Sequence, residues 1–214
     1  DALELAQKQI NLDSFNLSAV KEQYRQTLIR EHVATDILAQ QTEMGEKVLD
    51  RLFTTFGYKL QKGSVPERAL KQLQVGQAIV GGKLDRIDFI DEQTIRIVDY
   101  KTGGGLSNFA TKDKVKEIKA WKHKLQLTFY ALLASKDPEL SKFSTAEGHM
   151  VYVESDYQKG LTLSYFPSRD EIERLARLVE AVWQRVKTYD LPDTSQYEPS
   201  LAGIVQFESD LLSK

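Results

Sequence analysis

Two consecutive predicted strands, residues 77–90 and 94–101, constrain the fold of this chain most, because each carries a carboxylate among apolar residues. The short polar turn between them is centred on Glu92. An antiparallel hairpin with that centre places Asp85 directly opposite Asp99, with their Cβ atoms about 4.5–5.5 Å apart. Two like charges at that separation destabilise a sheet, so a protein seldom keeps them without a cation between them. The hairpin therefore predicts a cation site on one face of a β-sheet.

A lysine shares that face with the two carboxylates. Lys101 follows Asp99 by two positions, and side chains two positions apart on a strand point to the same side. The two carboxylates, with the carbonyl oxygen of Tyr100 as a further donor, suit a hard divalent ion such as Mg²⁺ or Mn²⁺. The lysine can orient or deprotonate water, or stabilise developing negative charge. Asp-x-Lys alone is a weak pattern, but with Asp85 it favours metal-dependent phosphodiester hydrolysis.

Gln126 and Tyr130 form a second polar pair. They lie four residues apart in a predicted helix and therefore on one helix face. The rest of that face is apolar, so the pair needs a polar partner when it is buried. A satisfied buried pair and a part of a functional site are both compatible with this pattern.

A basic run precedes that pair. It consists of Lys112, Lys114, Lys116, Lys119, Lys122 and Lys124, with His123 inside it. The net charge of the whole chain, −2, neither demands nor excludes a nucleic-acid partner. The run is either a solvated helix face or a surface that follows a phosphate backbone. On the second interpretation all seven residues contact DNA.

The composition excludes several kinds of site. The chain has no cysteine, which rules out disulfides, an iron–sulfur cluster and a thiolate zinc site. No apolar run approaches the roughly 18 residues of a membrane span, and no signal peptide opens the chain. We therefore expect an intracellular, cytoplasmic protein without a membrane partner. Because the first residue is Asp rather than Met, we also expect a piece of a longer protein.

Apolar periodicity predicts one α/β domain with a central mixed sheet and helices on both sides. Residues 1–60 have a helical pattern and should pack on a core formed by residues 61–190. Residues 191–214 carry no periodic signal and are predicted to be an irregular tail. Core strands are predicted at 69–75, 77–90, 94–101, 149–154 and 161–166, and core helices at 112–135 (in two pieces) and 169–189.

Three motifs in this order resemble the PD-(D/E)XK nucleases, and in particular the RecB-like branch. They are Gly-Lys-Leu-Asp85, Asp99-Tyr-Lys101-Thr-Gly and Gln126-Leu-Thr-Phe-Tyr130, within residues 67–134. The resemblance implies a restriction-endonuclease-like fold, in which a central mixed sheet is flanked by helices. It also implies that Asp85, Asp99 and Lys101 are catalytic, and that Gln126 and Tyr130 position the substrate or the lysine.

The motifs look most like nuclease domains of UvrD/Rep-like helicases and AddAB-type repair enzymes. That likeness implies a Mg²⁺- or Mn²⁺-dependent deoxyribonuclease, of exonuclease or endonuclease mode, in DNA repair or recombination. It further implies single-stranded DNA or DNA ends as substrate, and a helicase motor in the same parent chain or complex.

One departure from the family pattern concerns the metal. RecB-like enzymes usually carry a metal-binding His in a Gly-x-x-x-His setting, whereas Gly45 is followed here by Leu49 at that place. Glu46 is predicted to substitute as ligand, with Glu43 and Glu67 as alternatives. Without such a ligand the chain would be a catalytically silent module for DNA binding or protein docking. A restriction-type endonuclease is a third reading of the same motifs. The cysteine cluster that holds iron–sulfur in many relatives is absent.

Overall fold

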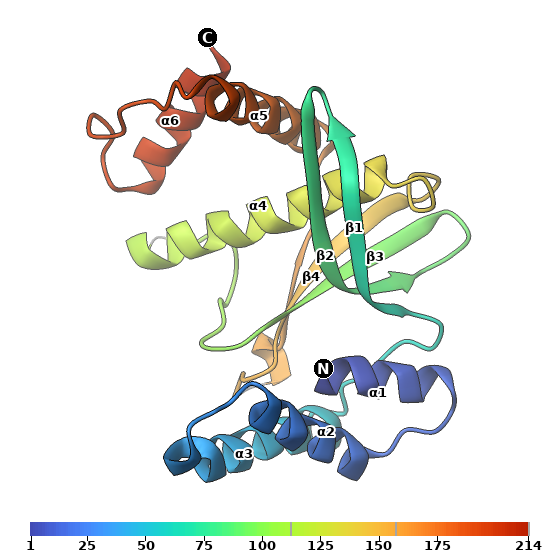
Figure 1. Ribbon diagram of the computed structural model, residues 1–214. Coiled ribbons are helices and arrows are strands. Elements are labelled where there is room, and N and C mark those ends of the chain that lie inside the picture. Colours follow the sequence, from blue (N-terminus) through green and yellow to red (C-terminus); the bar gives the residue numbers. More distant parts are fainter. Residues whose placement is uncertain (112, 157, 214) are drawn as a thin grey trace.

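A five-stranded sheet in the order β1-β2-β3-β4-β5 forms the centre of the molecule (Figure 1). The computed structural model describes residues 1–111, 113–156 and 158–213. β3 and β4 are parallel, and the other neighbouring strands are antiparallel. The strands are β1 (Val65–Val75), β2 (Ala78–Phe89), β3 (Thr94–Lys101), β4 (Ser144–Tyr152) and β5 (Thr162–Tyr165). The predicted mixed α/β fold is confirmed, although β1 and β4 begin earlier than the polar sequence before them suggested.

The β2–β3 hairpin has the predicted register. Arg86 pairs with Val98, so Asp85 and Asp99 occupy the next position along the same ladder. The turn closes where the N–H of Ile90 donates to the carbonyl of Thr94 at 2.9 Å. The carboxylates therefore lie on one face, as the turn centred on the 91–93 segment required.

Alternate residues of β3 separate the two faces of the sheet. Ile97 belongs to a buried cluster with Leu127 of α4 (Lys114–Lys136). Val98 belongs to another cluster, with Leu52 from the N-terminal helices. Asp99 has the parity of Ile97, and it therefore faces α4.

α4 is one continuous helix of 23 residues, whereas two pieces were predicted. Its first turn is capped by Asp113, whose carboxylate accepts hydrogen bonds from the N–H groups of Val115 and Lys116. It ends at Asp137, before Pro138. The lysine run masked the continuity, because it breaks the apolar pattern in the half of the helix that extends beyond the core.

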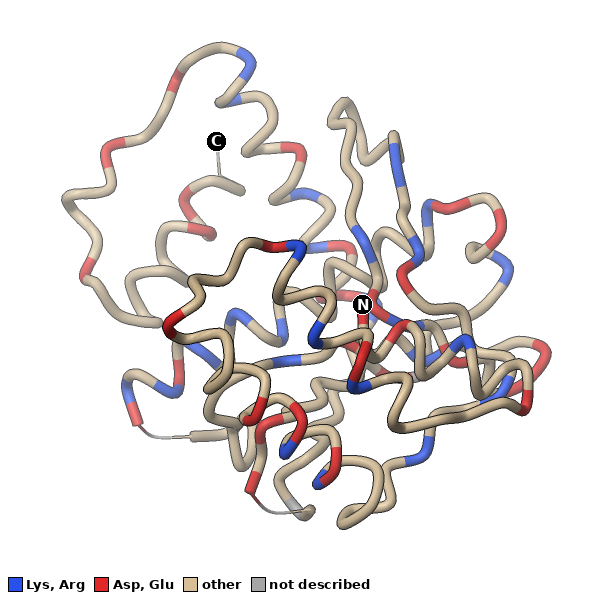
Figure 2. Tube along the Cα trace, turned by 60° about the horizontal axis from the view of Figure 1, so that its bottom comes forward, with Lys and Arg blue, Asp and Glu red and all other residues tan. Residues whose placement is uncertain are grey.

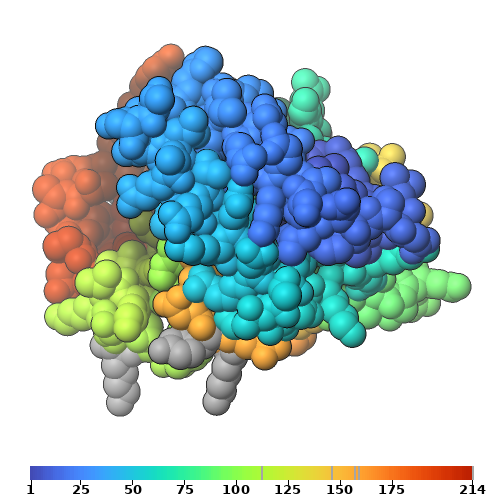
Figure 3. Space-filling model, turned by 90° about the horizontal axis from the view of Figure 1, so that it is seen from below, coloured from blue at the N-terminus to red at the C-terminus, as the bar shows by residue number. Residues whose placement is uncertain are grey.

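The N-terminal helices cover the face opposite α4, at the bottom of Figure 1, and they dominate the view in Figure 3. They are α1 (Ala2–Asn11), α2 (Leu17–Arg30) and α3 (Thr35–Asp50), and α3 runs into a π-helical turn, η1 (Arg51–Thr55). Gly57 then turns the chain with φ +59°, a conformation that favours glycine. Leu52 of η1 packs with Val98 and Val151 of the sheet, so these helices contribute to the buried core.

The C-terminal segment corrects one prediction, because residues 191–214 are not an irregular tail throughout. After α5 (Arg169–Thr188), α6 (Leu201–Leu212) packs on it through Leu211 and Leu175, at the top of Figure 1. The Ser200 hydroxyl caps α6. A helix this short depends on tertiary packing, which sequence periodicity does not report. A 3₁₀ turn, η2 (Gln158–Gly160), completes the described elements. No helix in the described part of the chain is long and apolar enough to cross a membrane.

Candidate active site

Four of the predicted residues form one hydrogen-bonded network between β3 and α4. Lys101 Nζ lies 2.6 Å from Asp99 Oδ2 and donates to Gln126 Oε1 at 2.8 Å. The Gln126 amide nitrogen donates to Asp99 Oδ1 at 2.9 Å and to the Tyr130 hydroxyl at 2.7 Å. The Tyr130 hydroxyl donates to Asp99 Oδ1 at 3.0 Å. Because Gln126 and Tyr130 lie on one face of α4, the helix holds Lys101 and Asp99 together through hydrogen bonds.

Asp99 is held deep in this network with one oxygen engaged and one available. Its Oδ1 accepts both hydrogen bonds from α4, whereas its buried Oδ2 accepts none with good geometry from the described residues. The close approach of Lys101 Nζ to Oδ2 compensates charge without that geometry. Burial, followed by the charge of Asp99, raises the pKa of Tyr130, so this phenol stays protonated and remains a donor.

Asp85 stands across the hairpin from Asp99. Its Oδ2 accepts a hydrogen bond of 2.8 Å from the backbone N–H of Tyr100. Burial raises the pKa of Asp85; the Tyr100 N–H opposes the shift, and the negative charges of Asp99 and Glu67 add to it. Carboxylates on the two strands that flank β2 are therefore close enough to disfavour the charged form of Asp85.

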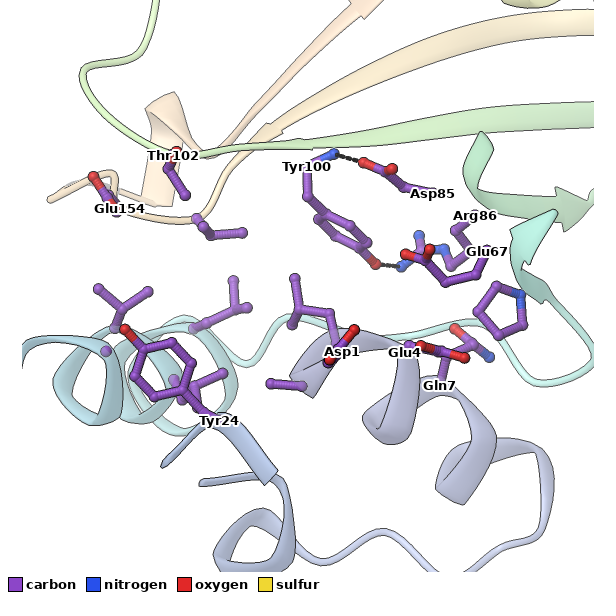
Figure 4. Close-up of a pocket in the computed structure, with 18 of the residues that line it drawn as sticks. Asp1, Glu4, Gln7, Tyr24, Glu67, Asp85, Arg86, Tyr100, Thr102 and Glu154 are labelled. Atoms are coloured by element: carbon purple, nitrogen blue, oxygen red, sulfur yellow. Dashed lines mark hydrogen bonds between the residues drawn. The ribbon is translucent and has the colours of Figure 1, made fainter. Parts of the chain in front are cut away.

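Glu67 occupies this place with an unusual backbone conformation. It has φ +56°, and it falls in the gap of the β1–β2 ladder between the pairs Pro66–Arg86 and Arg68–Leu84. The register is the same on both sides of this gap, so Glu67 lies opposite Asp85, and both residues line the same cavity (Figure 4). The Glu67 carboxylate forms an ion pair with Lys83. Strain of this kind persists where the surroundings fix it and is common at functional sites.

The cavity has a volume of about 510 Å³ and lies between the sheet and the N-terminal helices (Figure 4). Carboxylates from three elements face it: Glu4 of α1, Glu67 of β1 and Asp85 of β2. Glu4 is paired with Lys8 at 2.6 Å. α3 contributes Leu49 and other uncharged residues to the wall. The sheet side of the cavity therefore carries the carboxylates of Glu67 and Asp85 beside the Arg86 guanidinium, and the α3 side is mostly apolar.

The donor set suits a divalent ion that keeps several waters. Asp85 and Asp99 supply carboxylate oxygens, and the Oδ2 atom of Asp99 lacks a good hydrogen bond. Within residues 1–111, 113–156 and 158–213, no three His, Cys, Asp or Glu side chains converge closely enough to hold an ion by themselves. Mg²⁺ is commonly bound through one or two carboxylates plus water and substrate phosphate, which is what this pair can offer.

The structure does not bring Glu46 to the carboxylates, contrary to the prediction. Its Oε1 accepts a 2.7 Å hydrogen bond from Arg25 of α2, on a side of α3 that lines another cavity. Glu43 is exposed and paired with Lys47. The helical repeat explains this, because the cavity-lining stripe of α3 includes Gly45, Val48 and Leu49. Glu46 directly follows Gly45, so its side chain projects about 100° round the helix from that residue and away from the stripe.

Sequence reasoning missed a buried ionic cluster around Arg86, which lines the same cavity as Asp85. Arg86 donates to both oxygens of Asp88, at 2.7 and 3.0 Å, and also to the Tyr100 hydroxyl. Asp88 further accepts from the Ser64 hydroxyl at 2.6 Å. The cluster braces Tyr100, whose backbone N–H holds Asp85. The sequence does place Arg86 and Asp88 two positions apart, and therefore on one face of the strand. A charged pair on a strand is usually exposed, however, so its burial was not predicted.

The lysine run divides into exposed and engaged residues. Lys114, Lys116 and Lys122 are exposed along the first turns of α4, where Figure 2 shows basic positions gathered. Lys119 donates to the carbonyl of Gly104, and Lys124 lies 5.3 Å from the centre of the Tyr165 ring. Lys112 lies outside the described residues.

His123 is not part of that surface, which corrects its predicted contact with DNA. It is 9% exposed, and its Nδ1 lies 2.8 Å from the Tyr152 hydroxyl of β4. Its place on the helix explains the difference, because it precedes Gln126 by three positions and shares its face toward the sheet.

Comparison with known proteins gives one family. The family model described as "PD-(D/E)XK nuclease superfamily" matches residues 2–198. Among solved structures, one titled "Crystal structure of SSO0001" is 17% identical, covers 78% of this chain and 70% of that chain, and has a TM-score of 0.35. No curated protein matches this chain.

Proposed function

Because this chain belongs to the PD-(D/E)XK nuclease superfamily, we propose that it is a deoxyribonuclease dependent on Mg²⁺ or Mn²⁺. The observation that carries the proposal is the network in which Gln126 and Tyr130 hold Asp99 beside Lys101. Asp85 stands opposite Asp99 in the hairpin register. An acidic pair, a fixed ammonium group and a cavity beside them are the parts that phosphodiester hydrolysis requires.

Asp85 and Asp99 would hold the ion, with the Tyr100 carbonyl as a further donor. Glu67 replaces Glu46 as the candidate for an additional ligand, because it faces the cavity of Asp85 and its strand neighbours that site. A bound divalent ion supplies an activated water and charge neutralisation at the phosphate. The protein's own contribution is to keep two mutually repelling carboxylates in place before the ion arrives.

Lys101 would place its ammonium beside the scissile phosphate. Its Nζ is fixed from two sides, by the Asp99 carboxylate and the Gln126 amide oxygen. A donor fixed in advance stabilises negative charge that develops on phosphate oxygens, and costs no reorganisation during the reaction. Gln126 therefore acts as a spacer, since it contacts Asp99 and Lys101 through the two ends of one amide.

Single-stranded DNA or a DNA end is the proposed substrate. The exposed lysines Lys114, Lys116 and Lys122 would contact the phosphate backbone and lead the strand toward Lys101. We further propose exonuclease action within a helicase–nuclease for repair or recombination in the cytoplasm, with a helicase motor in the same chain or complex. These finer assignments rest on the motif likeness of residues 67–134.

One observation favours a second function, a catalytically silent module that binds DNA or a protein. α3 offers Leu49 to the cavity where related nucleases carry a histidine ligand, and Glu46 is turned away. Loss of one ligand weakens a metal site more than it weakens a lysine-lined surface. The silent module would keep the salt-dependent affinity for DNA and lack cleavage.

Cleavage of labelled single-stranded DNA in Mg²⁺ or Mn²⁺ distinguishes the two. Asp99→Asn keeps the volume and an acceptor for α4, so it should fold and lose at least about a hundredfold in rate. Lys101→Met should lose a comparable factor, while exposed Lys71→Ala, on β1, should cleave like the wild type. Equal rates for the wild type and both site variants would refute the enzyme and leave the silent module. Trimming of ends without sequence preference would argue against a restriction-type endonuclease.

A further inference from the structure

α4 presents a third polar residue in line with the two that face Asp99. His123, Gln126 and Tyr130 are spaced i, i+3 and i+7, which places them on one helical stripe. Gln126 and Tyr130 contact Lys101 and Asp99, respectively, on β3. His123 lies one turn closer to the N-terminus of α4, where the stripe passes over the ends of β3 and β4.

The partner of His123 is the strand neighbour of Lys101. Tyr152 of β4 pairs with Lys101 in the parallel ladder and is fully buried, with 0% of its surface exposed. Its hydroxyl lies 2.8 Å from His123 Nδ1. The residue after it, Val153, donates its backbone N–H to the carbonyl of Lys101 at 3.1 Å. His123 is thus connected through one phenol to the backbone that carries the lysine.

The same phenol supports the loop that leaves the active site. After Lys101 the chain passes through Gly103-Gly104-Gly105, and this loop leads to α4 (Figure 1). Gly105 lies on the Tyr152 ring, since a Cβ there would be 3.1 Å from Cγ. Leu106, 3% exposed, follows this loop and is buried in the same cluster as Tyr152; its backbone also lowers the pKa of the Tyr152 hydroxyl, against the larger effect of burial.

Two further contacts hold the same loop. The N–H of Gly103 donates to Glu154 Oε2 at 2.6 Å. Lys119 donates to the carbonyl of Gly104 and lies 5.8 Å from the centre of the Tyr152 ring. A run of three glycines has a high entropy when free, so its order depends on these contacts.

The two side chains share one hydrogen bond, and the His123 tautomer decides which of them donates. Burial, then the positive charges of Lys101 and Lys119, lowers the pKa of His123 to about 4, so its ring is neutral. Burial raises the pKa of Tyr152 to about 12, which keeps its proton in place.

We propose that Tyr152 and His123 are positioning residues for Lys101, because they fix the glycine loop 103–105 and the strand end from which the lysine extends. The pair touches neither Asp85 nor Asp99 through a hydrogen bond among the described contacts, and it acts through the backbone. The proposal rests on the proposed nuclease function for its kinetic consequence. Its structural consequence is independent of cleavage.

The central test is Tyr152→Phe, which removes one oxygen atom and keeps the ring. We expect kcat on single-stranded DNA to fall on the order of tenfold or more, with KM nearly unchanged, because the lysine is displaced while the DNA surface is intact. Tyr197→Phe is the matched control; it removes a hydroxyl that bonds Asp210 at 2.8 Å on α6, and should leave kcat unchanged. At His123, Asn keeps a polar atom near the Nδ1 position and should restore part of the activity that Leu loses.

A readout without DNA separates this proposal from the nuclease function. Competitive acetylation of the folded protein, followed by mass spectrometry, reports how freely each lysine reacts. In Tyr152→Phe we expect Lys101 to react several-fold faster, and amides 103–106 to exchange hydrogen faster, with Lys71 and the Tyr197→Phe protein as references. If the wild type cleaves no DNA, the nuclease proposal fails, and this measurement still decides the role of the pair. Unchanged Lys101 reactivity and loop exchange in Tyr152→Phe would overturn it.

Discussion

The surroundings of Asp85 disfavour its charged form. It is half-buried beside Asp99 and Glu67, and burial is the largest cause of its raised pKa. A group whose folded pKa lies above its unfolded value binds more protons in the folded state. Folding stability then falls as the pH rises from the unfolded pKa, near 4, through the folded one. Asp85 should therefore cost stability at neutral pH unless a cation is bound.

Asp85→Asn tests this directly. In a chelator at neutral pH the variant should melt at a higher temperature than the wild type, because it removes the buried charge. Added Mg²⁺ should raise the melting temperature of the wild type by linkage, and leave that of the variant unchanged. The difference between the two proteins should shrink below the unfolded pKa, where both side chains are neutral.

Asp91→Asn is the control for that comparison, since Asp91 lies in the exposed turn of the same hairpin. The Asp91 carboxylate accepts a hydrogen bond from the Gln93 N–H, which lowers the pKa of Asp91. Asp91→Asn removes this favourable charge, so the variant should melt at a lower temperature than the wild type. A wild type that gains nothing from Mg²⁺, or an Asp85→Asn protein that melts earlier in chelator, would contradict the assignment of Asp85 as a metal ligand.

The hairpin shows which part of an element a sequence can specify. A turn centred on Glu92 fixes the register of β2 and β3, and the period of two along each strand then determines which side chains share a face. Asp85, Asp99 and Lys101 could be found in this way. Gln126 and Tyr130 could be found as a helical pair, although their partner was not apparent until α4 was placed over β3.

Features that depend on tertiary contacts could not be found by periodicity. Glu67 lies opposite Asp85 in the β1–β2 register, but the polar sequence around it did not indicate that β1 begins at Val65, and its φ of +56° could not be predicted. Glu46 was selected by its place in a motif, and the pairing with Arg25 from another helix decided against it. α6 needs α5 to be stable, and the burial of His123 needs Tyr152 from a strand almost thirty residues away.

The buried cluster around Arg86 supports a prediction on the stability of β2. Asp88 and Arg86 are 2% and 4% exposed, and they are bonded through both carboxylate oxygens. Asp88→Asn keeps the shape of the side chain but leaves the buried Arg86 guanidinium without its counter-charge. We expect the free energy of unfolding to fall by about 3–5 kcal/mol, measured by urea denaturation.

Glu173→Gln provides the comparison, because Glu173 pairs with Arg169 on the exposed side of α5. This change also removes one carboxylate from an ion pair with arginine, but water solvates both partners, so unfolding should be unaffected within error. Equal stability of Asp88→Asn and wild type would mean that water or Tyr100 compensates Arg86, and that the cluster does not brace the strand.

The whole molecule separates its acidic and basic surfaces by the sheet. The cavity lined by Glu4, Glu67 and Asp85 lies between the sheet and α1–α3. The exposed lysines lie on α4, which packs on the other face of the sheet (Figure 1). Lys101 and Asp99 extend toward α4 at the strand ends, between the two surfaces. A DNA strand bound along α4 would thus approach the Lys101 ammonium group first and the carboxylates of Asp99 and Asp85 next. This order avoids a long path for phosphates past the acidic wall.

The salt dependence of DNA affinity tests that path. Replacement of Lys114, Lys116 and Lys122 by Gln removes three phosphate contacts. Each contact with single-stranded DNA contributes about 0.7 to the slope of log K against log salt, so the slope should become shallower by about 2. Fluorescence anisotropy with labelled single-stranded DNA in chelator, over a series of NaCl concentrations, measures the slope without cleavage.

A charge-matched protein separates location from net charge. Lys47, Lys62 and Lys187 are exposed on α3, on the connector before β1 and at the end of α5. Their replacement by Gln lowers the net charge by the same three units, so long-range attraction falls equally in both proteins. Only loss of contacts on α4 should flatten the slope, because counterions are released where phosphates are bound. Equal slopes in the two triple variants would show that DNA does not follow α4, and would place its path elsewhere on the protein.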